Sequence, residues 1–337
     1  MTASSVRVTP GRPSSTAGRP SSVTDASVAR LLRRLAASSD TGSESSAGDG
    51  TCRRTVTTVA PMTGDPVAEL PLATAGDVVA AQRRAREAQA IWAGVPVRRR
   101  AQVLLRFHDL VLERQDEALD LIQWENGKVR RDAHLEVLDV ANTARYYARR
   151  APGLLAPSSR RGVYPVLTKV VELHRPVGVV GVISPWNYPL SLAVGDTLPA
   201  LVAGNAVVQK VDTQTALTAL WSAELMDEAG LPADLWQLVV GEPSDLGDAL
   251  VGGSDFVMFT GSTAAGRRIA RQAGSSSPAA RSSSGARTRC WCSTTPTSPR
   301  PSRERCAPAS RPRASCACRS SACTSRTRST TRSCPRS

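Results

Sequence analysis

The last 63 residues of this 337-residue chain cannot build an ordinary hydrophobic core. Residues 275–337 contain no Leu, Ile, Val, Met or Phe, whereas they contain 13 Arg, a single acid (Glu304) and seven of the eight cysteines. A segment with so few apolar side chains gains too little from burial to offset the conformational entropy that folding removes. We therefore predict a disordered Arg/Ser/Cys-rich tail over residues 275–337, so that the folded part ends near Gly274.

Charge and cysteine content look ordinary once the tail is set aside. Of the formal net charge of +14, the 13 Arg and one Glu of the tail supply +12, which leaves +2 for residues 1–274. Only Cys52 precedes the tail, so the folded part has no disulfide framework and suits a reducing compartment. Neither a secretory signal nor an apolar run of about 18 residues is present. These features predict a cytoplasmic protein with no membrane partner.

The first half of the chain reads as a short extension followed by a helical region. Residues 1–49 are predicted to be mostly disordered, apart from a helix over 23–37 with Asp25 as its cap. A β-hairpin and three amphipathic helices follow, with Pro152 ending the third helix. The predicted strands cover 55–59 and 67–72, and the helices cover 75–93, 98–126 and 132–150.

The second half alternates short apolar runs with helical segments. After a strand-like segment at 163–173, buried strands are expected at 178–183, 206–210, 235–240 and 256–259, with helices at 192–203, 215–228, 244–252 and 264–272. Such alternation predicts an α/β fold with a doubly wound parallel sheet. Ligands of these sheets bind at the carboxyl ends of the strands, where most of the polar motifs of this chain fall.

Three motifs could carry chemistry, and the first two also have a purely structural explanation. Residues 184–189 (Ser-Pro-Trp-Asn-Tyr-Pro) place the Asn187 amide where it could stabilise an oxyanion, although the segment could be a Pro-rich turn with Trp186 filling the core. Lys210 could bind a ribose or a phosphate, or it could be a solvated strand-end lysine. Phe259-Thr-Gly-Ser262 opens a helix whose first N–H groups favour a pyrophosphate. Glu125-Asn-Gly-Lys128 is most simply the polar end of a helix.

Together these motifs resemble NAD(P)-dependent aldehyde dehydrogenases over residues 50–274. The matching strings are GVVGVISPWNYPL, LVAGNAVVQK, AGLPADLWQLVVG and DFVMFTGSTAAG, in the order and spacing of the family, and within it they are most similar to actinobacterial succinate-semialdehyde dehydrogenases. The resemblance implies a cofactor domain built from residues 50–157 and 177–274. It also implies a projecting hairpin at 158–176 that bridges to another subunit, and therefore a homo-oligomer for an intact member of the family.

The resemblance assigns roles to individual residues. Asn187 matches the catalytic amide that donates to the oxyanion, and no metal site is expected. The positions that match the cofactor site are Ile183, Ser184, Pro185, Trp186, Lys210, Thr213, Gly241, Phe259, Thr260, Gly261 and Ser262. Members that prefer NAD tend to have Glu where Thr213 stands, and a hydroxyl there removes a carboxylate that would repel a 2′-phosphate. NADP is therefore the expected cofactor, with NAD possible.

The tail contains neither the cysteine nucleophile nor the glutamate base that the family requires. The tail can be re-read in a shifted frame, in which the third base of each codon is joined to the first two bases of the next codon. In that frame, codons allowed for the residues from Ser282 onward give ELGGKNPMLVLDDADL, and those allowed for residues 314–323 give QLCLSIERL. Both strings resemble the missing family segments, and Trp291 fixes one valine codon completely. Our hypothesis is a frameshift near Ser275, which leaves the catalytic domain largely missing. Cys316 would then be an accidental neighbour of the lost nucleophile.

Three readings of the chain follow. By family, the protein oxidises an aldehyde, with succinate semialdehyde as the expected substrate, and this chain is a catalytically inactive product. Alternatively, the basic tail binds nucleic acid through its 13 arginines, but Trp291 is its only stacking aromatic, so no specific nucleic-acid partner is expected. In the third reading the chain does not persist, because an uncovered sheet edge and apolar surface favour aggregation.

Overall fold

The computed structural model describes residues 22–37, 54–164, 168–276, 279–284 and 291–292. The chain divides into two units, Met1–Thr294 and Thr295–Ser337, and the second lies outside the described residues. All of the elements below belong to the first unit.

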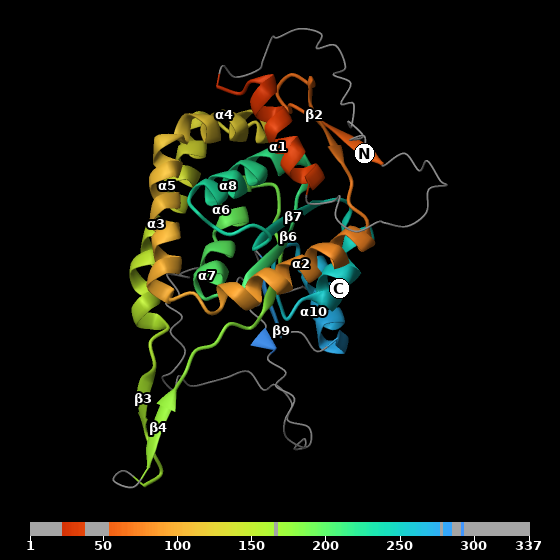
Figure 1. Ribbon diagram of the computed structural model, residues 1–337. Helices are drawn as coiled ribbons and strands as arrows, with labels where there is room; N and C mark the ends of the chain where they lie inside the picture. The colour runs from red at the N-terminus through yellow and green to blue at the C-terminus, as the bar shows by residue number, and fades with distance from the viewer. Residues whose placement is uncertain (1–21, 38–53, 165–167, 277–278, 285–290, 293–337) are drawn as a thin grey trace, which may run out of the picture. The chain divides into compact units, whose positions relative to one another are not determined.

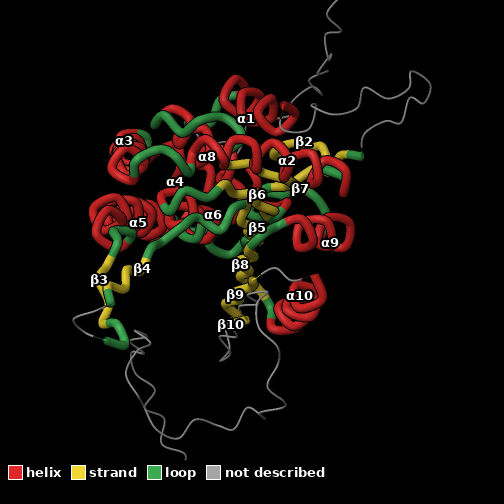
Figure 2. The backbone as a smooth tube through the Cα atoms, turned by 60° about the horizontal axis from the view of Figure 1, so that its bottom comes forward, coloured by secondary structure: helices red, strands yellow, loops and turns green. Residues whose placement is uncertain are grey.

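A parallel sheet forms the centre of the unit, as the alternating pattern predicts (Figures 1 and 2). Its strands follow the order β10-β9-β8-β5-β6-β7, and only β10 is antiparallel to its neighbour. Every residue of β6 and β7 is buried, which explains why both strands are mainly apolar, although Gln209, Lys210 and Gln237 are buried with them. The strands are β5 (Val179–Ile183), β6 (Ala206–Val211), β7 (Trp236–Val240), β8 (Phe256–Gly261), β9 (Ala279–Ser284) and β10 (Trp291–Cys292).

Helices cover both faces of the sheet, which confirms the doubly wound architecture. Figure 2 shows α9 and α10 on one side of the strands and α6 and α8 on the other. Helix α2 packs with α9 on the first side, and α3, α4 and α5 form an outer layer over α6, α7 and α8. The helices are α2 (Ala75–Trp92), α3 (Val97–Glu113), α4 (Gln115–Asn126), α5 (Arg130–Leu154), α6 (Pro189–Val194), α7 (Thr197–Val202), the 3₁₀ turn η1 (Thr213–Thr215), α8 (Ala216–Glu228), α9 (Pro243–Gly253) and α10 (Thr263–Ser276).

Two predicted helices are each divided in the structure. The helix expected over 98–126 breaks at Arg114, whose backbone (φ −110°, ψ 26°) leaves helical geometry while its guanidinium bonds Glu117 and Glu228. No Gly or Pro marks this break. The helix expected over 192–203 is α6 and α7, and Pro189 starts α6 earlier than predicted. Pro152 does not end α5 but lies in its last turn.

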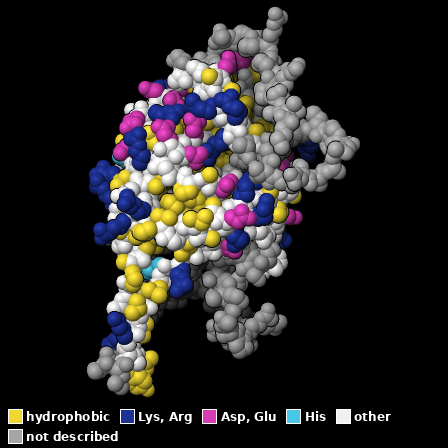
Figure 3. Space-filling view, viewed as in Figure 1, with side chains coloured by type: hydrophobic (Ala, Val, Ile, Leu, Met, Phe, Trp, Pro, Cys, Tyr) yellow, Lys and Arg dark blue, Asp and Glu magenta, His cyan; other side chains and the backbone are white. Residues whose placement is uncertain are grey.

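Two antiparallel hairpins accompany the sheet. The first, β1 (Thr55–Val59) with β2 (Pro66–Pro71), agrees with the prediction. The second, β3 (Ser158–Arg161) with β4 (Lys169–Glu172), projects from the body, and Figure 3 shows hydrophobic side chains along it. The strand expected from residue 163 begins only at Lys169, and residues 165–167 lie outside the described part. Val163 and Tyr164 are 87% and 63% exposed.

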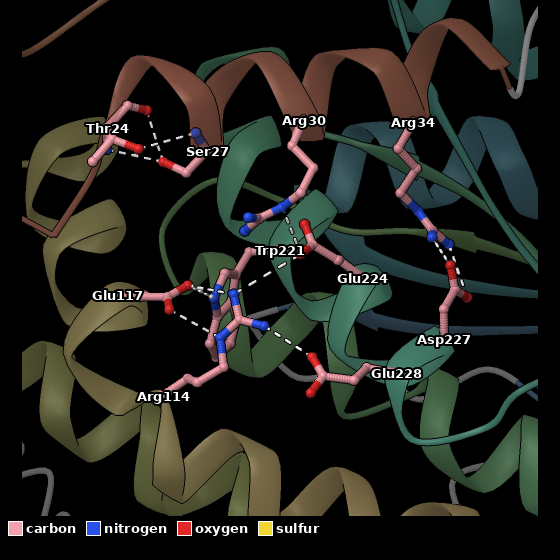
Figure 4. Close-up of polar contacts among 10 residues, drawn as sticks. All are labelled: Thr24, Ser27, Arg30, Arg34, Arg114, Glu117, Trp221, Glu224, Asp227 and Glu228. Carbon is pink, nitrogen blue, oxygen red and sulfur yellow. Dashed lines mark hydrogen bonds and ion pairs between the residues drawn. The ribbon is translucent and has the colours of Figure 1, made fainter.

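The helix predicted near the N-terminus is α1 (Asp25–Ala37), which lies across α8 (Figure 4). The apolar face of this helix is buried and contains Val28, Leu31 and Leu35. Its cap is Thr24 rather than Asp25, because Thr24 N–H donates to Ser27 Oγ at 2.9 Å and Ser27 N–H donates to Thr24 Oγ1 at 3.1 Å. The remaining residues of the 1–49 extension are outside the described part, except for 22–24.

The prediction of a disordered tail from residue 275 onward is wrong for the part that the structure describes. Helix α10 continues to Ser276, and β9 pairs in parallel with β8, from Ala279 opposite Phe256 to Ser284 opposite Gly261. Main-chain hydrogen bonds to an open sheet edge do not need apolar side chains, so this segment can add a strand without a core of its own. The rest of the tail, including Cys316, is outside the described residues.

Within the described ranges, no helix combines the length and the apolar character that crossing a membrane requires.

Candidate cofactor site

The predicted site residues lie at one edge of the sheet, where the parallel strands end. Ile183 on β5 is in register with Lys210 on β6 and with Phe259 on β8. The chain runs from β5 through β6 to β7 on one side and then returns to β8 on the other side of β5. This reversal between β5 and β8 is the topological switch point at which open α/β sheets bind ligands. The structure therefore brings the motifs that follow β5, β6 and β8 together, although they are separated in sequence.

A cavity of about 380 Å³ opens beside the end of β6. Its wall combines residues of the β1 hairpin, the end of β6, η1 and the start of α9. The lining residues are Val56, Thr57, Thr58, Lys210, Asp212, Thr213, Gln214, Glu242 and Pro243. Of these, only Lys210 and Thr213 were predicted from the sequence to belong to a cofactor site.

Lys210 is the cation of this cavity. The residue is only 6% exposed, and its ammonium forms no hydrogen bond or ion pair with the residues that the structure describes. Burial lowers the pKa of Lys210, and the carboxylates of Asp212 and Glu242 oppose that shift. Because Lys210 lines the cavity and its ammonium makes no hydrogen bond to the described residues, an oxygen-rich ligand entering this cavity would find a donor ready to bind it.

Gln214 anchors the turn that carries Thr213. The Asp212 side chain accepts the Gln214 N–H at 3.1 Å and so starts η1. The Gln214 amide then donates to the Val59 carbonyl at 2.8 Å and to the Glu125 carbonyl at 2.9 Å. One side chain thus holds the hairpin, η1 and the end of α4 against each other around the cavity.

The loop after β5 divides into a buried start and an exposed end. Ser184 is 6% exposed and accepts a hydrogen bond from Gln209 Nε2 at 3.0 Å, so its hydroxyl faces the core. Ile183 and Pro185 are half-buried. Trp186 is 55% exposed and does not fill the core, which rules out that structural explanation. The Asn187 side chain is exposed and makes no hydrogen bond with the described residues.

The ends of β7 and β8 are closely packed. Gly241 is buried, and a Cβ there would lie 2.9 Å from Leu246 Cδ1. Phe259 is 5% exposed, and its ring would contact a Cβ at Gly261 at 2.6 Å. Thr260 is half-buried, and Ser262 is exposed with its hydroxyl accepting the Ala265 N–H at 3.3 Å. Ser262 therefore caps α10, whose first turn points its N–H groups toward the switch point.

Sequence reasoning missed the role of the residues at the end of α4. Glu125 is fully buried, and its carboxylate accepts hydrogen bonds from Leu217 N–H and Thr218 N–H at 2.7 Å each. Burial raises the pKa of Glu125 to about 7, while these bonds and one from the Thr218 hydroxyl oppose the shift. Its position four residues after buried Leu121 placed it on the apolar face of the helix, and that spacing was the available signal.

Comparison with known proteins agrees with this geometry. The profile described as the aldehyde dehydrogenase family matches residues 49–286. A relative from Mycolicibacterium smegmatis, which carries the provisional name of an NADP(+) succinate-semialdehyde dehydrogenase, is 51% identical over 212 residues. That alignment covers 63% of this chain and 41% of the relative. The chain spans less than half the length of the curated relatives it matches.

Solved structures show the same similarity. An NAD-dependent benzaldehyde dehydrogenase from Corynebacterium glutamicum has a TM-score of 0.65 at 33% identity and covers 70% of this chain and 52% of its own. A succinate-semialdehyde dehydrogenase from Burkholderia pseudomallei has a TM-score of 0.65 at 28% identity, covering 67% of this chain and 47% of its own.

Proposed function

Because this chain belongs to the aldehyde dehydrogenase family, we propose that residues 54–276 form an NAD(P)-binding unit of that family. The observation that carries the proposal is the alignment of Ile183, Lys210 and Phe259 at the switch point, beside the cavity at Lys210. The residues present fit a dinucleotide. The Lys210 ammonium and the Thr213 hydroxyl belong to residues that line the cavity, and the N-terminus of α10 lies at the end of β8.

The two ends of the dinucleotide have different partners in this proposal. Lys210 and Thr213 hold the adenosine ribose, and the N–H groups of the first turn of α10 hold the pyrophosphate. The segment from Ile183 to Trp186 lines the path to the nicotinamide. NADP is the expected form, with NAD possible, and the provisional name of the mycolicibacterial relative supports NADP.

The reaction proposed for the family domain is oxidation of an aldehyde to its acid: R–CHO + NAD(P)⁺ + H₂O gives R–COO⁻ + NAD(P)H + 2 H⁺. When bound, the nicotinamide accepts the hydride. The Asn187 amide donates a hydrogen bond to the oxygen that becomes negative when the carbonyl is attacked. Succinate semialdehyde is the proposed substrate, because relatives carry that activity in their names.

We propose further that this chain binds the cofactor but does not oxidise aldehydes. Support comes from the out-of-frame reading of residues 275–337, which removes the cysteine nucleophile and the glutamate base together. Among the side chains that the structure describes there is no cysteine. The exposed β3–β4 hairpin, with Val163 and Tyr164 uncovered, supports the proposal that the intact protein is a homo-oligomer, and the single cysteine before residue 275 supports a cytoplasmic location.

Calorimetric titration of the full chain with NADP⁺ and NAD⁺ tests the binding proposal. We expect Lys210→Met to weaken NADP⁺ binding by about tenfold, the usual loss for one hydrogen bond to a charged group. Lys169→Met, on the exposed hairpin, is the matched control and should leave the affinity unchanged. Equal affinities for wild type and Lys210→Met would place the cofactor elsewhere.

The catalytic proposal is tested by NADP⁺ reduction with succinate semialdehyde and with a short aliphatic aldehyde. The chain as given and a frame-corrected chain are assayed in parallel. Activity of the corrected chain alone is the expected result. Turnover by the chain as given would show that a tail cysteine is correctly placed and would refute the frameshift account.

A further inference from the structure

The loop after β5 is held from outside by the segment that joins α4 to α5. Asn126 Nδ2 donates to the Trp186 carbonyl at 2.8 Å, and Lys128 Nζ donates to the Asn187 carbonyl at 2.8 Å. Two consecutive carbonyls of the loop are therefore bound by side chains lying about 60 residues earlier in the sequence. Both bonds leave the Trp186 and Asn187 side chains free to face a ligand.

Glu136 on α5 supports this contact from behind. One of its oxygens pairs with Lys128 Nζ, and the other accepts the Leu190 N–H at 3.0 Å and the Ser191 N–H at 3.1 Å. These two N–H groups belong to the first turn of α6, directly after the loop. The Lys128 and Glu136 side chains are 13% and 1% exposed, so this is a buried ion pair and not a surface one.

Among the described residues, the polar contacts of Lys128 all lead to the loop or to Glu136. Its Nζ lies 4.0 Å from the centre of the Tyr188 ring, besides its bonds to Asn187 and Glu136. A lysine ammonium has three donors in a compact group, which suits binding a carboxylate, a carbonyl and an aromatic face at once. A solvated lysine at the polar end of a helix would show none of these contacts.

We propose that Lys128, with Asn126 and Glu136, is a positioning device for residues 184–189. By fixing the backbone on both sides of Asn187, it sets the direction in which Trp186 and Asn187 project. Neither side chain is hydrogen-bonded to the residues that the structure describes, so no hydrogen bond of its own fixes the direction of either one. The inference rests on the proposed function, because it matters for binding only if this loop lines the nicotinamide half of the cofactor.

The two halves of the cofactor provide a direct test. Intact NADP⁺ would reach both the cavity at Lys210 and the loop after β5, whereas 2′,5′-ADP, its adenosine half, would reach only the cavity. A loosened loop should therefore weaken binding of NADP⁺ and spare binding of 2′,5′-ADP. General damage to the fold would weaken both.

Calorimetric titrations of the full chain with NADP⁺ and with 2′,5′-ADP compare wild type, Lys128→Met, Lys128→Arg and Asn126→Ala. We expect Lys128→Met to raise the Kd of NADP⁺ about tenfold and to change that of 2′,5′-ADP by less than about twofold. Lys128→Arg should recover part of the loss, because it keeps the charge and the donors but carries them on a larger, planar group. Arg131→Met is the matched control, since Arg131 is an exposed cation near the same helix start.

Hydrogen exchange followed by mass spectrometry gives a readout that needs no ligand. Peptides that contain Leu190 and Ser191 should exchange faster in Lys128→Met, while peptides from β6 and β7 should keep wild-type protection. If Lys128→Met fails to fold because Glu136 is left buried without its partner, Asn126→Ala carries the same test, since it removes only a loop-facing bond.

The outcomes separate the two proposals. Parallel weakening of NADP⁺ and 2′,5′-ADP, or unchanged exchange at residues 190–191 in Lys128→Met, would overturn the positioning role. If wild type binds neither ligand, the proposed function fails, and the exchange experiment alone decides whether Lys128 holds the loop.

Discussion

The carboxylate of Glu125 accepts two hydrogen bonds from Thr218, from the backbone N–H at 2.7 Å and from the hydroxyl at 2.6 Å. The two residues lie 93 positions apart, and their contact joins the end of α4 to the first turn of α8. Because α8 follows η1 directly, this bond also fixes the turn that carries Thr213. The wall of the cavity therefore depends on a carboxylate that has no access to solvent.

Glu125 should make the stability of the protein depend on pH. Burial raises its pKa in the folded state from 4.5 to about 7, so the folded protein binds a proton more tightly than the unfolded chain does. The resulting stabilisation is complete below pH 4.5 and is lost as the pH rises to 7 and beyond. Urea unfolding of wild type and Glu125→Gln across this range should show a difference that changes by at most about 1.4 kcal/mol per pH unit.

The change of the unfolding free energy with pH decides this test, and not its absolute value. The amide of Glu125→Gln has one acceptor oxygen fewer for the Leu217 N–H, the Thr218 N–H and the Thr218 hydroxyl, and this loss shifts the stability at every pH. Glu87→Gln, which removes an exposed carboxylate of α2, should follow the wild-type pH dependence. Parallel curves for wild type and Glu125→Gln would contradict the prediction.

Glu242 should oppose binding of a 2′-phosphate. It lines the cavity with Asp212, so two carboxylates and one cation, Lys210, are among the described residues that line it. Since a phosphate adds up to about two negative charges, we expect Glu242→Gln to lower the Kd of NADP⁺ about fivefold and that of NAD⁺ much less. Asp248→Asn removes an exposed charge from α9, the helix that begins directly after Glu242, and serves as the control. An equal effect on both cofactors would show that Glu242 does not distinguish them.

Gln209 should be essential for the packing behind the loop. Its side chain is fully buried, donates to Ser184 Oγ and the Ala193 carbonyl at 3.0 Å each, and accepts from Trp236 Nε1 at 2.9 Å. Gln209→Leu keeps the volume but leaves buried partners unsatisfied, which should lower the free energy of unfolding by about 2–4 kcal/mol. Gln102→Leu, on the exposed face of α3, should change it by less than about 0.5 kcal/mol. Equal losses in both variants would show that the buried bonds contribute little.

Helix α1 should be held mainly by its apolar face. Leu31 is 2% exposed, and Leu31→Ala should cost about 2–4 kcal/mol of unfolding free energy. By contrast, the ion pair of Arg30 with Glu224 is partly exposed and should contribute less than about 1 kcal/mol when Arg30→Met is measured. Arg33→Ala, on the exposed face, is the control. A larger loss for Arg30→Met than for Leu31→Ala would reverse this ranking.

The sequence predicted the sheet well because burial of whole strands leaves a strong pattern. The apolar runs that became β5, β6, β7 and β8 were placed within two residues of their observed ends. The same pattern located Asn187, Lys210 and Ser262 at one edge of the sheet. It did not place the break at Arg114, because an ion-pair cluster, and not Gly or Pro, ends α3 there.

By itself, then, the sequence determined the family, the doubly wound sheet and the edge at which its site residues lie. Those features follow from periodic burial and from turn residues adjacent in the chain. Only the tertiary structure decided that Glu125 supports α8, that Lys128 binds the Asn187 carbonyl, and that Glu242 shares a cavity with Lys210. Each of these contacts joins polar groups that are distant in the sequence, and such pairs leave no periodic pattern, since their partners are chosen by how the elements pack.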